Sequence, residues 1–163
     1  MAAESSFDLV SDFDQQELVN ALDQARREIA TRYDFKGGKV SFELGKDAIT
    51  LNADDEYRAS AAKDLLETKA VRRGLSLKIF EWGKLEPAAG GSVRQHIGLK
   101  RGLTSDQAKE LSKRIRDGFP KVKPVIQGDA VRVSAKSKDE LQAVIAELRA
   151  LDYPVALQFQ NYR

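Results

Sequence analysis

"DAITLNA" (Asp47–Ala53) and "DAVRVSA" (Asp129–Ala135) are two stretches of one pattern, 82 positions apart in a chain of 163 residues. Each follows a turn-forming glycine, alternates apolar and polar residues as a strand does, and leads into a predicted helix. The same offset places "LSLKIF" (Leu75–Phe80) on "LQFQNY" (Leu157–Tyr162). A repeat of about half the chain indicates an internal duplication, so both halves are expected to share one fold.

Each half supplies a strand, a helix, a hairpin, a second helix and a last strand. Apolar residues alternate in the strands and recur every three or four positions in the helices. The first half gives Ser5–Ser11, a helix beginning after Asp14, a hairpin over Val40–Ala53, a helix over Asp55–Arg73 and a strand over Leu75–Trp82. The second gives Val93–Leu99, a helix after Thr104, a hairpin over Lys121–Lys136, a helix after Ser137 and a strand over Val155–Tyr162.

Two βαββαβ units predict an α+β fold of two ferredoxin-like repeats, each an antiparallel sheet with both helices on one face. The run "EPAAGGS" at residues 86–92 is rich in small residues and is predicted to be a flexible linker. The expected division is therefore residues 1–85, a linker at 86–92, and residues 93–163.

The composition limits the classes of protein. With 42% hydrophobic and 32% charged residues, the chain can fill a core and remain hydrated at its surface. It contains no apolar run of about 18 residues. Its amino terminus lacks the pattern of a signal peptide, and it has no cysteine. We expect a cytoplasmic protein without a membrane partner.

Charge is unevenly distributed along the sequence. The formal net charge is only +2, but residues 94–138 carry 12 basic and 4 acidic side chains, whereas residues 1–93 carry 13 and 17. Such a basic segment is the electrostatic footprint expected for a polyanion. The alternative interpretation is that the basic segment is only a solvated helix face together with a loop and binds no polyanion.

The predicted fold leaves one face of each sheet uncovered, and this is the main functional signal. If Leu75, Leu77 and Ile79 face the helices, the alternate residues of that strand point to the open face. The same alternation places Arg94 and His96 of one strand, and Arg132 of another, on open faces. The basic pair at residues 100–101 is chosen for another reason: it precedes a helix start, where a phosphate could meet backbone amides. The candidate nucleotide-binding or nucleic-acid-binding residues are Lys78, Phe80, Trp82, Arg94, His96, Lys100, Arg101 and Arg132.

Aromatic rings among cations would stack bases and hold phosphates, as in RNA-binding sheets. The alternative is that the two open faces pack together and bury Phe80, Trp82 and Tyr162 between the repeats. The RNP consensus, with its closely spaced aromatic residues, is absent.

The stretch "RYDFKGGK" (Arg32–Lys39) combines cations, rings and glycines, but it is not a P-loop. A P-loop needs a glycine where Tyr33 stands and a serine or threonine where Val40 stands. The stretch fits the end of a helix, with Gly37 after the last turn. Arg32 and Lys36 stay possible rim contacts for a ligand, as do Lys109, Lys113 and Arg116, which share one helix face.

Signatures of catalysis are weak. A single histidine and the lack of cysteine exclude thiol chemistry and a zinc site built from several Cys and His ligands. The clustered carboxylates Asp54, Asp55 and Glu56 begin a helix, where capping accounts for them. We expect no catalytic residues, no metal site and no cofactor.

Several long motifs resemble the bacterial YajQ family across nearly the whole chain. They are "SSFDLVSDFDQQELVNALDQARREIATRYDFKG", "RRGLSLKIFEW", "IQGDAVRVSAKSKDELQAVIAELR" and the final "LQFQNYR". The resemblance implies two interlocked ferredoxin-like repeats of RNP-like topology, so that a terminal strand completes the sheet of the other repeat. It also implies nucleotide or nucleic-acid binding without established catalysis and, in some relatives, a cyclic di-GMP effector that works through a transcription regulator.

Two hypotheses follow. The first is a module that binds RNA, GTP or cyclic di-GMP through the sheet-face residues, with an affinity that falls steeply with salt. The second is an adaptor whose basic helix face (Lys109, Lys113 and Arg116) docks an acidic protein partner. The family provides no agreed motif that selects among these positions, so the candidate residues rest on the sheet-face argument.

Overall fold

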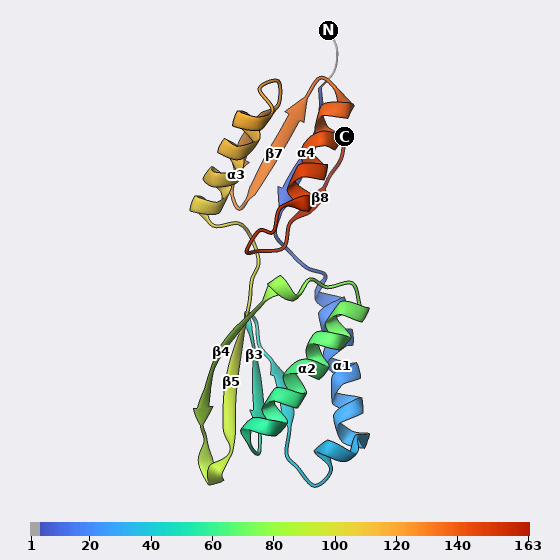
Figure 1. The fold of residues 1–163 in the computed structure, drawn as a ribbon, viewed down its shortest axis with the longest axis vertical. Coiled ribbons are helices and arrows are strands. Elements are labelled where there is room, and N and C mark those ends of the chain that lie inside the picture. The colour runs from blue at the N-terminus through green and yellow to red at the C-terminus, as the bar shows by residue number, and fades with distance from the viewer. Residues whose placement is uncertain (1–3) are drawn as a thin grey trace. The chain divides into compact units, whose positions relative to one another are not determined.

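The computed structural model describes residues 4–163 and has the predicted α+β fold (Figure 1). Its helices are α1 (Gln15–Thr31), α2 (Glu56–Arg72), α3 (Ser105–Gly118) and α4 (Lys138–Ala150). Its strands are β1 (Ser5–Val10), β2 (Ser41–Leu44), β3 (Ala48–Ala53), β4 (Phe80–Pro87), β5 (Val93–Leu99), β6 (Lys123–Gln127), β7 (Ala130–Ala135) and β8 (Gln158–Gln160). Short 3-10 turns, named η1 to η3, cover Tyr33–Phe35, Leu77–Ile79 and Ala89–Gly91. No helix of this described range is long and apolar enough to span a membrane.

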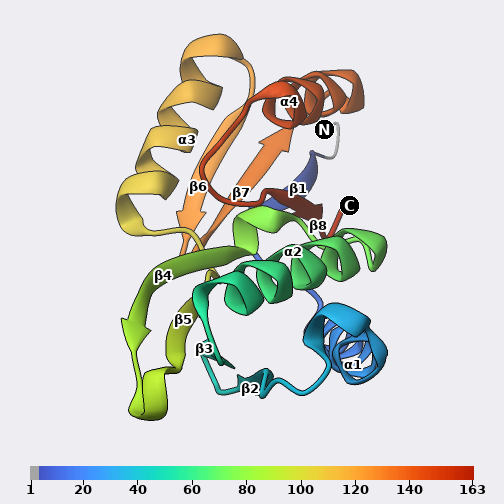
Figure 2. The ribbon, with the colours of Figure 1, turned by 60° about the horizontal axis from the view of Figure 1, so that its bottom comes forward.

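The strands form two four-stranded antiparallel sheets, of order β6-β7-β1-β8 and β2-β3-β5-β4. The chain divides accordingly into two compact units. We call Phe13–Lys100 the central unit, and the chain up to Asp12 together with Arg101–Arg163 the terminal unit. The helices of each unit lie on one side of its sheet, which confirms two ferredoxin-like sandwiches (Figures 1 and 2).

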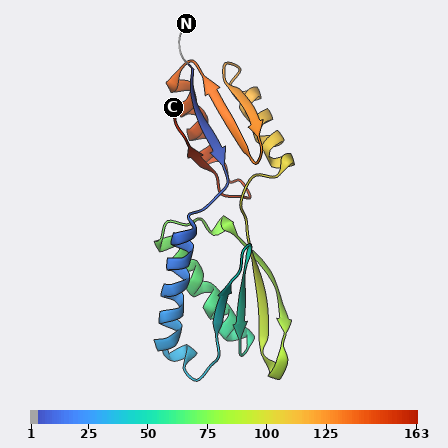
Figure 3. The ribbon, with the colours of Figure 1, turned by 180° about the vertical axis from the view of Figure 1, so that it is seen from behind.

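This division differs from the expected one because the first strand of each predicted repeat lies in the other sheet. Strand β1 pairs with β7 and β8, as Figure 3 shows, while β5 pairs with β3 and β4. Both strands occupy the same position, third in their sheets, and run antiparallel to both neighbours. The terminal unit therefore has the order β1-α3-β6-β7-α4-β8, which is a βαββαβ unit. The central unit is inserted into this order between β1 and α3.

Residues 86–92, predicted as a linker, form the last two residues of β4 and the turn that leads into β5. Pro87 pairs with Val93 across the turn, and the Ala88 amide donates to the Ser92 carbonyl at 2.8 Å. Gly90 and Gly91 have positive φ angles of 70° and 80°. A run of small residues suits such a tight reversal as well as it suits a linker, because glycine adopts these angles without steric cost.

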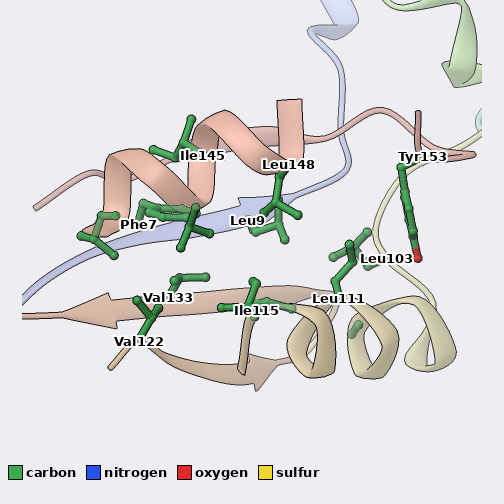
Figure 4. Close-up of a cluster of buried hydrophobic side chains, with 14 of the residues drawn as sticks. Phe7, Leu9, Leu103, Leu111, Ile115, Val122, Val133, Ile145, Leu148 and Tyr153 are labelled. Atoms are coloured by element: carbon green, nitrogen blue, oxygen red, sulfur yellow. The ribbon is translucent and has the colours of Figure 1, made fainter. Parts of the chain in front are cut away.

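Each unit has its own core beneath its helices. In the terminal unit the core joins β1 to elements more than a hundred residues away (Figure 4). Phe7 and Leu9 of β1 are fully buried beside Val133, Leu111 and side chains of α4. Full burial of such side chains contributes about 1.5 to 3 kcal/mol each. Strand β1 is therefore held in the terminal unit by packing as well as by its hydrogen-bonded ladders.

The helix starts confirm the predicted caps. The Asp14 side chain accepts from the amides of Gln16 and Glu17, and Thr104 forms a reciprocal capping box with Gln107. Helix α2 is followed by Gly74, which has a φ of +80°. Local capping chemistry thus fixes the helix ends from nearby sequence alone.

Candidate functional site

The two rings predicted for the open sheet face, Phe80 and Trp82, lie on the helix-covered side instead. Phe80 pairs in register with Leu99, and Trp82 pairs with the fully buried Ile97. Phe80 is only 5% exposed. The ammonium group of Lys63, on α2, lies 4.7 Å from the centre of the Trp82 ring. The prediction of the face was wrong, so neither ring stands ready to stack a base on the open sheet.

The error originates in the residues just before β4. Leu77–Ile79 forms a 3-10 turn, which the Ser76 hydroxyl begins by accepting the Lys78 amide. A turn of three residues breaks the strict alternation of a strand, and a shift by one residue moves every later side chain to the other face. Lys78 therefore belongs to this turn and not to a sheet face.

Arg94 and His96 of β5 do lie on the open face, as predicted. The Arg94 Nε is 3.4 Å from the Asn52 Oδ1, and the His96 Nδ1 is 3.4 Å from the Thr50 Oγ1. The register of the four strands also places carboxylates on this face, from Glu43, Glu81 and Glu86. Because three carboxylates surround one arginine on this face, its charge does not favour the binding of a polyanion.

Lys100 lies at the opposite end of β5 from Arg94. Its amide donates to the Ile79 carbonyl at 2.8 Å, which places it beside the turn that carries Lys78. Six residues of strand separate it from Arg94, or about 20 Å. The predicted residues of the central unit therefore do not converge on one site.

The predicted arginines of the terminal unit are held by acids at the start of the chain. Arg101 pairs with Asp12 at 2.6 Å, and Arg132 pairs with Asp8 at 3.0 Å. The hydrogen bond from Arg132 lowers the pKa of the Asp8 carboxyl below its usual value of 3.8, with a further contribution from Asn161. A third acid, Glu4, lies 3.4 Å from Lys123. The basic segment at residues 94–138 thus loses part of its excess charge to β1 and its flanks.

The basic face of α3 belongs to the part of that segment whose cations form no ion pair in the described chain. Lys109, Lys113 and Arg116 are all exposed. Within residues 4–163 these three side chains form no ion pair, although Asp106, Glu110 and Asp117 lie on the same helix.

A groove along α1 and α2 of the central unit combines the groups that a nucleotide requires. It has a volume of about 370 Å³, within the range of small-molecule sites. Among the predicted residues it includes Arg32; Lys36 lies outside its lining. The polar and aromatic residues that line it are Glu28, Arg32, Asp34, Tyr57, Ser60, Asp64, Thr68, Lys69 and Arg72.

Part of the groove is a fixed network of ion pairs. Arg32 donates two hydrogen bonds to Asp34, at 3.0 and 2.6 Å, and lies 3.6 Å from Glu28. Glu28 also binds the Lys69 ammonium group at 3.3 Å. The hydrogen bond from Arg32 lowers the pKa of the Asp34 carboxyl. These four charges compensate one another and shape one wall.

Other groups in the groove are available to a ligand. Tyr57 is 71% exposed, and in the described chain its hydroxyl, the Asp64 carboxylate and the Arg72 guanidinium make no hydrogen bond or ion pair. The three residues recur at intervals of seven and eight along α2, so they lie on one face of the helix. Tyr57 and Arg72 are about 22 Å apart along the axis.

Comparison with known proteins agrees with a binding role. The family model described as "Nucleotide-binding protein YajQ-like" matches residues 5–163. The chain belongs to the YajQ-like family. A protein of Trichodesmium erythraeum named "Nucleotide-binding protein" is 58% identical over 163 residues, and one of Synechococcus elongatus is 60% identical over 163, in both cases covering each chain completely. A nucleotide-binding protein of Chloroflexus aurantiacus is 59% identical over 165 residues, again over the whole of both chains.

The YajQ-like match covers both units, so the family assignment applies to the complete fold. The names of these relatives state a binding activity and no catalytic one. In the part of the chain described by the structure, no group of three or more His, Asp or Glu residues is placed to hold a metal ion.

Three groove residues of this YajQ-like chain, Tyr57, Asp64 and Arg72, were not among the sequence predictions. A signal was present, because a tyrosine on the polar side of an amphipathic helix has no core to enter. The sequence could show that Tyr57 is exposed, but not that α1 lies beside it to form the second wall.

Proposed function

We propose that this protein binds a guanine nucleotide in the α1–α2 groove of the central unit. The observation that carries the proposal is the presence of an exposed ring, an unpaired carboxylate and an unpaired guanidinium, from Tyr57, Asp64 and Arg72, in one groove. The names of the YajQ-like relatives supply the ligand class, a nucleotide. No catalytic step is part of the proposal.

Each group has a distinct role in this arrangement. Stacking of a base on an aromatic side chain contributes about 1 to 3 kcal/mol and does not depend on which base is present. The Asp64 carboxylate supplies the discrimination, because guanine presents two adjacent N–H donors on its pairing edge and a carboxylate accepts both. Adenine presents an acceptor at the same place, so it leaves the carboxylate unpaired.

Phosphate is expected at Arg72. Its guanidinium is not engaged by a carboxylate, whereas Arg32 and Lys69 are already held by Asp34 and Glu28. Arginine binds phosphate through two parallel hydrogen bonds. A ligand that reaches from Tyr57 to Arg72 must be longer than a nucleoside monophosphate, which favours GTP, cyclic di-GMP or a short RNA.

We place the protein among effectors, in which the bound nucleotide alters contact with another macromolecule. The resemblance to relatives that act through a transcription regulator supports this regulatory role. The groove itself offers binding groups only, so turnover of the nucleotide is not expected.

Titration of the full chain with GTP, cyclic di-GMP, ATP and a short single-stranded RNA, each at two salt concentrations, tests the proposal. Guanine ligands should bind more tightly than ATP, and Tyr57→Ala or Arg72→Ala should weaken them by about tenfold or more. Asp64→Asn should reduce the preference for guanine over adenine.

Tyr33→Ala is the matched control, because Tyr33 is 89% exposed and does not line the groove. The affinity of the Tyr33→Ala variant for the guanine ligands should equal that of the unmodified chain. Undiminished binding by the Tyr57 and Arg72 variants, with melting temperatures unchanged, would remove the groove from consideration.

A further inference from the structure

Strand β6 is the least protected sheet edge of the molecule, and it lies beside the basic face of α3. It forms one end of the order β6-β7-β1-β8, so one side of its backbone has no strand partner. Two of its five residues are large, apolar and exposed, Val125 at 52% and Ile126 at 43%. An exposed apolar edge is a template for pairing with another chain.

The other three edges are each protected. In β2 the Arg26 guanidinium donates to the carbonyl of Phe42 at 2.7 Å, which occupies an edge acceptor. In β4 a bulge between Trp82 and Leu85 interrupts the pairing. Strand β8 has only three residues and is followed by Asn161, with a φ of 53°. In β6 the protecting residues, Lys123 and Pro124, lie at the start of the strand, which leaves Val125 and Ile126 exposed beyond them.

The charge beside this edge is positive. Lys109, Lys113 and Arg116 recur at intervals of four and three, which places them in one stripe along α3. We call these three residues the basic stripe. The acids Asp106, Glu110 and Asp117 follow the outer, solvent-facing ridge of α3 beside Lys113, whereas Lys109 and Arg116 lie on one flank of the helix. Burial, and to a smaller extent the charge of Glu110, raises the pKa of Tyr153 in the segment after α4. Helix α3 packs mainly on β6. The flank that carries Lys109 and Arg116 lies away from Glu110, and we take it to face the β6 edge.

The distances suit an extended peptide. Helix α3 packs on β6 (Figure 2). The basic stripe spans about 10 Å from Lys109 to Arg116. Alternate residues of an added strand lie about 7 Å apart on one face, so two acidic side chains would meet the stripe while the intervening side chains point away. Ile126 pairs in register with the buried Val131, so it lies on the helix side, where it offers apolar contact.

We propose that β6 and the basic stripe of α3 form a docking site for an extended acidic segment of a partner protein, added as a fifth strand of the sheet. Backbone hydrogen bonds to an edge strand give affinity, and the side chains facing α3 give specificity. A second copy of the chain is a poor occupant, because two β6 edges joined by a two-fold axis would bring two basic stripes together. The site lies in the terminal unit and is independent of the nucleotide groove.

The test uses a labelled ten-residue peptide in which glutamate alternates with valine and threonine. Three comparison probes are a peptide with lysine in place of glutamate, the glutamate peptide N-methylated at alternate residues, and a ten-nucleotide single-stranded RNA. The protein is the full chain, its Lys109→Glu/Lys113→Glu variant, and Lys46→Glu as the control for a charge reversal elsewhere. Lys46 is exposed and lies in the β2–β3 turn of the central unit.

The glutamate peptide should bind and shift the backbone amide resonances of β6, and the double variant should weaken it by about tenfold while Lys46→Glu does not. The lysine peptide and the N-methylated peptide should fail to bind. Four results would overturn the proposal: no binding, equal binding by the double variant with its melting temperature unchanged, equal binding by the N-methylated peptide, or tighter binding of the RNA to the same β6 amides.

Discussion

The terminal and central units share one architecture but carry different surfaces. In the terminal unit, acids at the start of the chain neutralise Arg101, Lys123 and Arg132, whereas the cations of the basic face of α3 form no ion pair within the described residues. In the central unit, the helix layer contains a groove with an exposed tyrosine, and the open sheet face is mixed in charge. A duplicated fold thus conserves the core and the strand order, while ligand chemistry is set by surface side chains that differ between the copies.

The largest expected loss of stability comes from a substitution in β1, and it tests whether this strand belongs to the terminal unit. Phe7 is fully buried and its ring lies 5.6 Å from that of Phe159. Phe7→Ala should destabilise the terminal unit by about 3 to 5 kcal/mol, because it leaves a cavity. Hydrogen exchange should accelerate in β6, β7 and α4 and stay slow in β3 and α2. Faster exchange confined to the central unit would contradict the assignment of β1.

A smaller loss of stability is expected from a substitution in β4, an edge strand of the central unit. A Cβ at Gly83 would lie 2.7 Å from the His96 carbonyl oxygen, whereas a Cβ at Gly98 would meet nothing closer than 3.4 Å. Gly83→Ala should cost about 1 to 3 kcal/mol by overpacking against backbone. Gly98→Ala is the matched control and should change stability far less in urea unfolding. Equal effects would mean that the β4 bulge is not close-packed against β5.

The smallest effect concerns charge compensation in the terminal unit. The pKa of Asp8 is lowered in the folded state by Arg132, so the ion pair stabilises the fold above the usual carboxyl pKa of 3.8 and is lost as the pH falls through the folded value. Asp8→Asn should cost about 1 kcal/mol near neutral pH. This loss of stability should be smaller at about pH 3. Urea unfolding of the unmodified chain and of Asp8→Asn at the two pH values measures the difference in the free energy of unfolding. A penalty that persists in acid would rule out the charge of Asp8 as its cause.

Local sequence patterns predicted the helices, their caps and the two hairpins, because these depend on neighbouring residues. The hairpin strands β3 and β7 lie at the predicted offset of 82 residues. The face of β4 was not predictable from alternation, since the 3-10 turn at Leu77–Ile79 reverses it. Local patterns alone could not place β1 and β5, because each fits the same position in either sheet and only long-range packing selects between them. A terminal strand in the sheet of the other repeat was expected only from the resemblance to the YajQ family.

The candidate site shows the same limit. Arg32 was predicted as a rim residue and lines the groove, while Arg101 and Arg132 were predicted as free cations and are paired with acids about 90 and 120 residues away in sequence. Counting charge along the chain cannot detect such pairs. Tyr57 could be recognised as exposed, but its neighbours in the groove come from α1 and η1.

The most direct test of the nucleotide proposal is a titration of isotope-labelled full chain with GTP or cyclic di-GMP, followed by the backbone amide resonances. We expect saturable shifts concentrated in α2 from Tyr57 to Arg72 and at the groove residues Arg32 and Asp34, with the terminal unit unaffected. Shifts centred instead on β5 around Arg94 and His96, or on Lys100 and Arg101, would contradict it and return the site to the sheet faces.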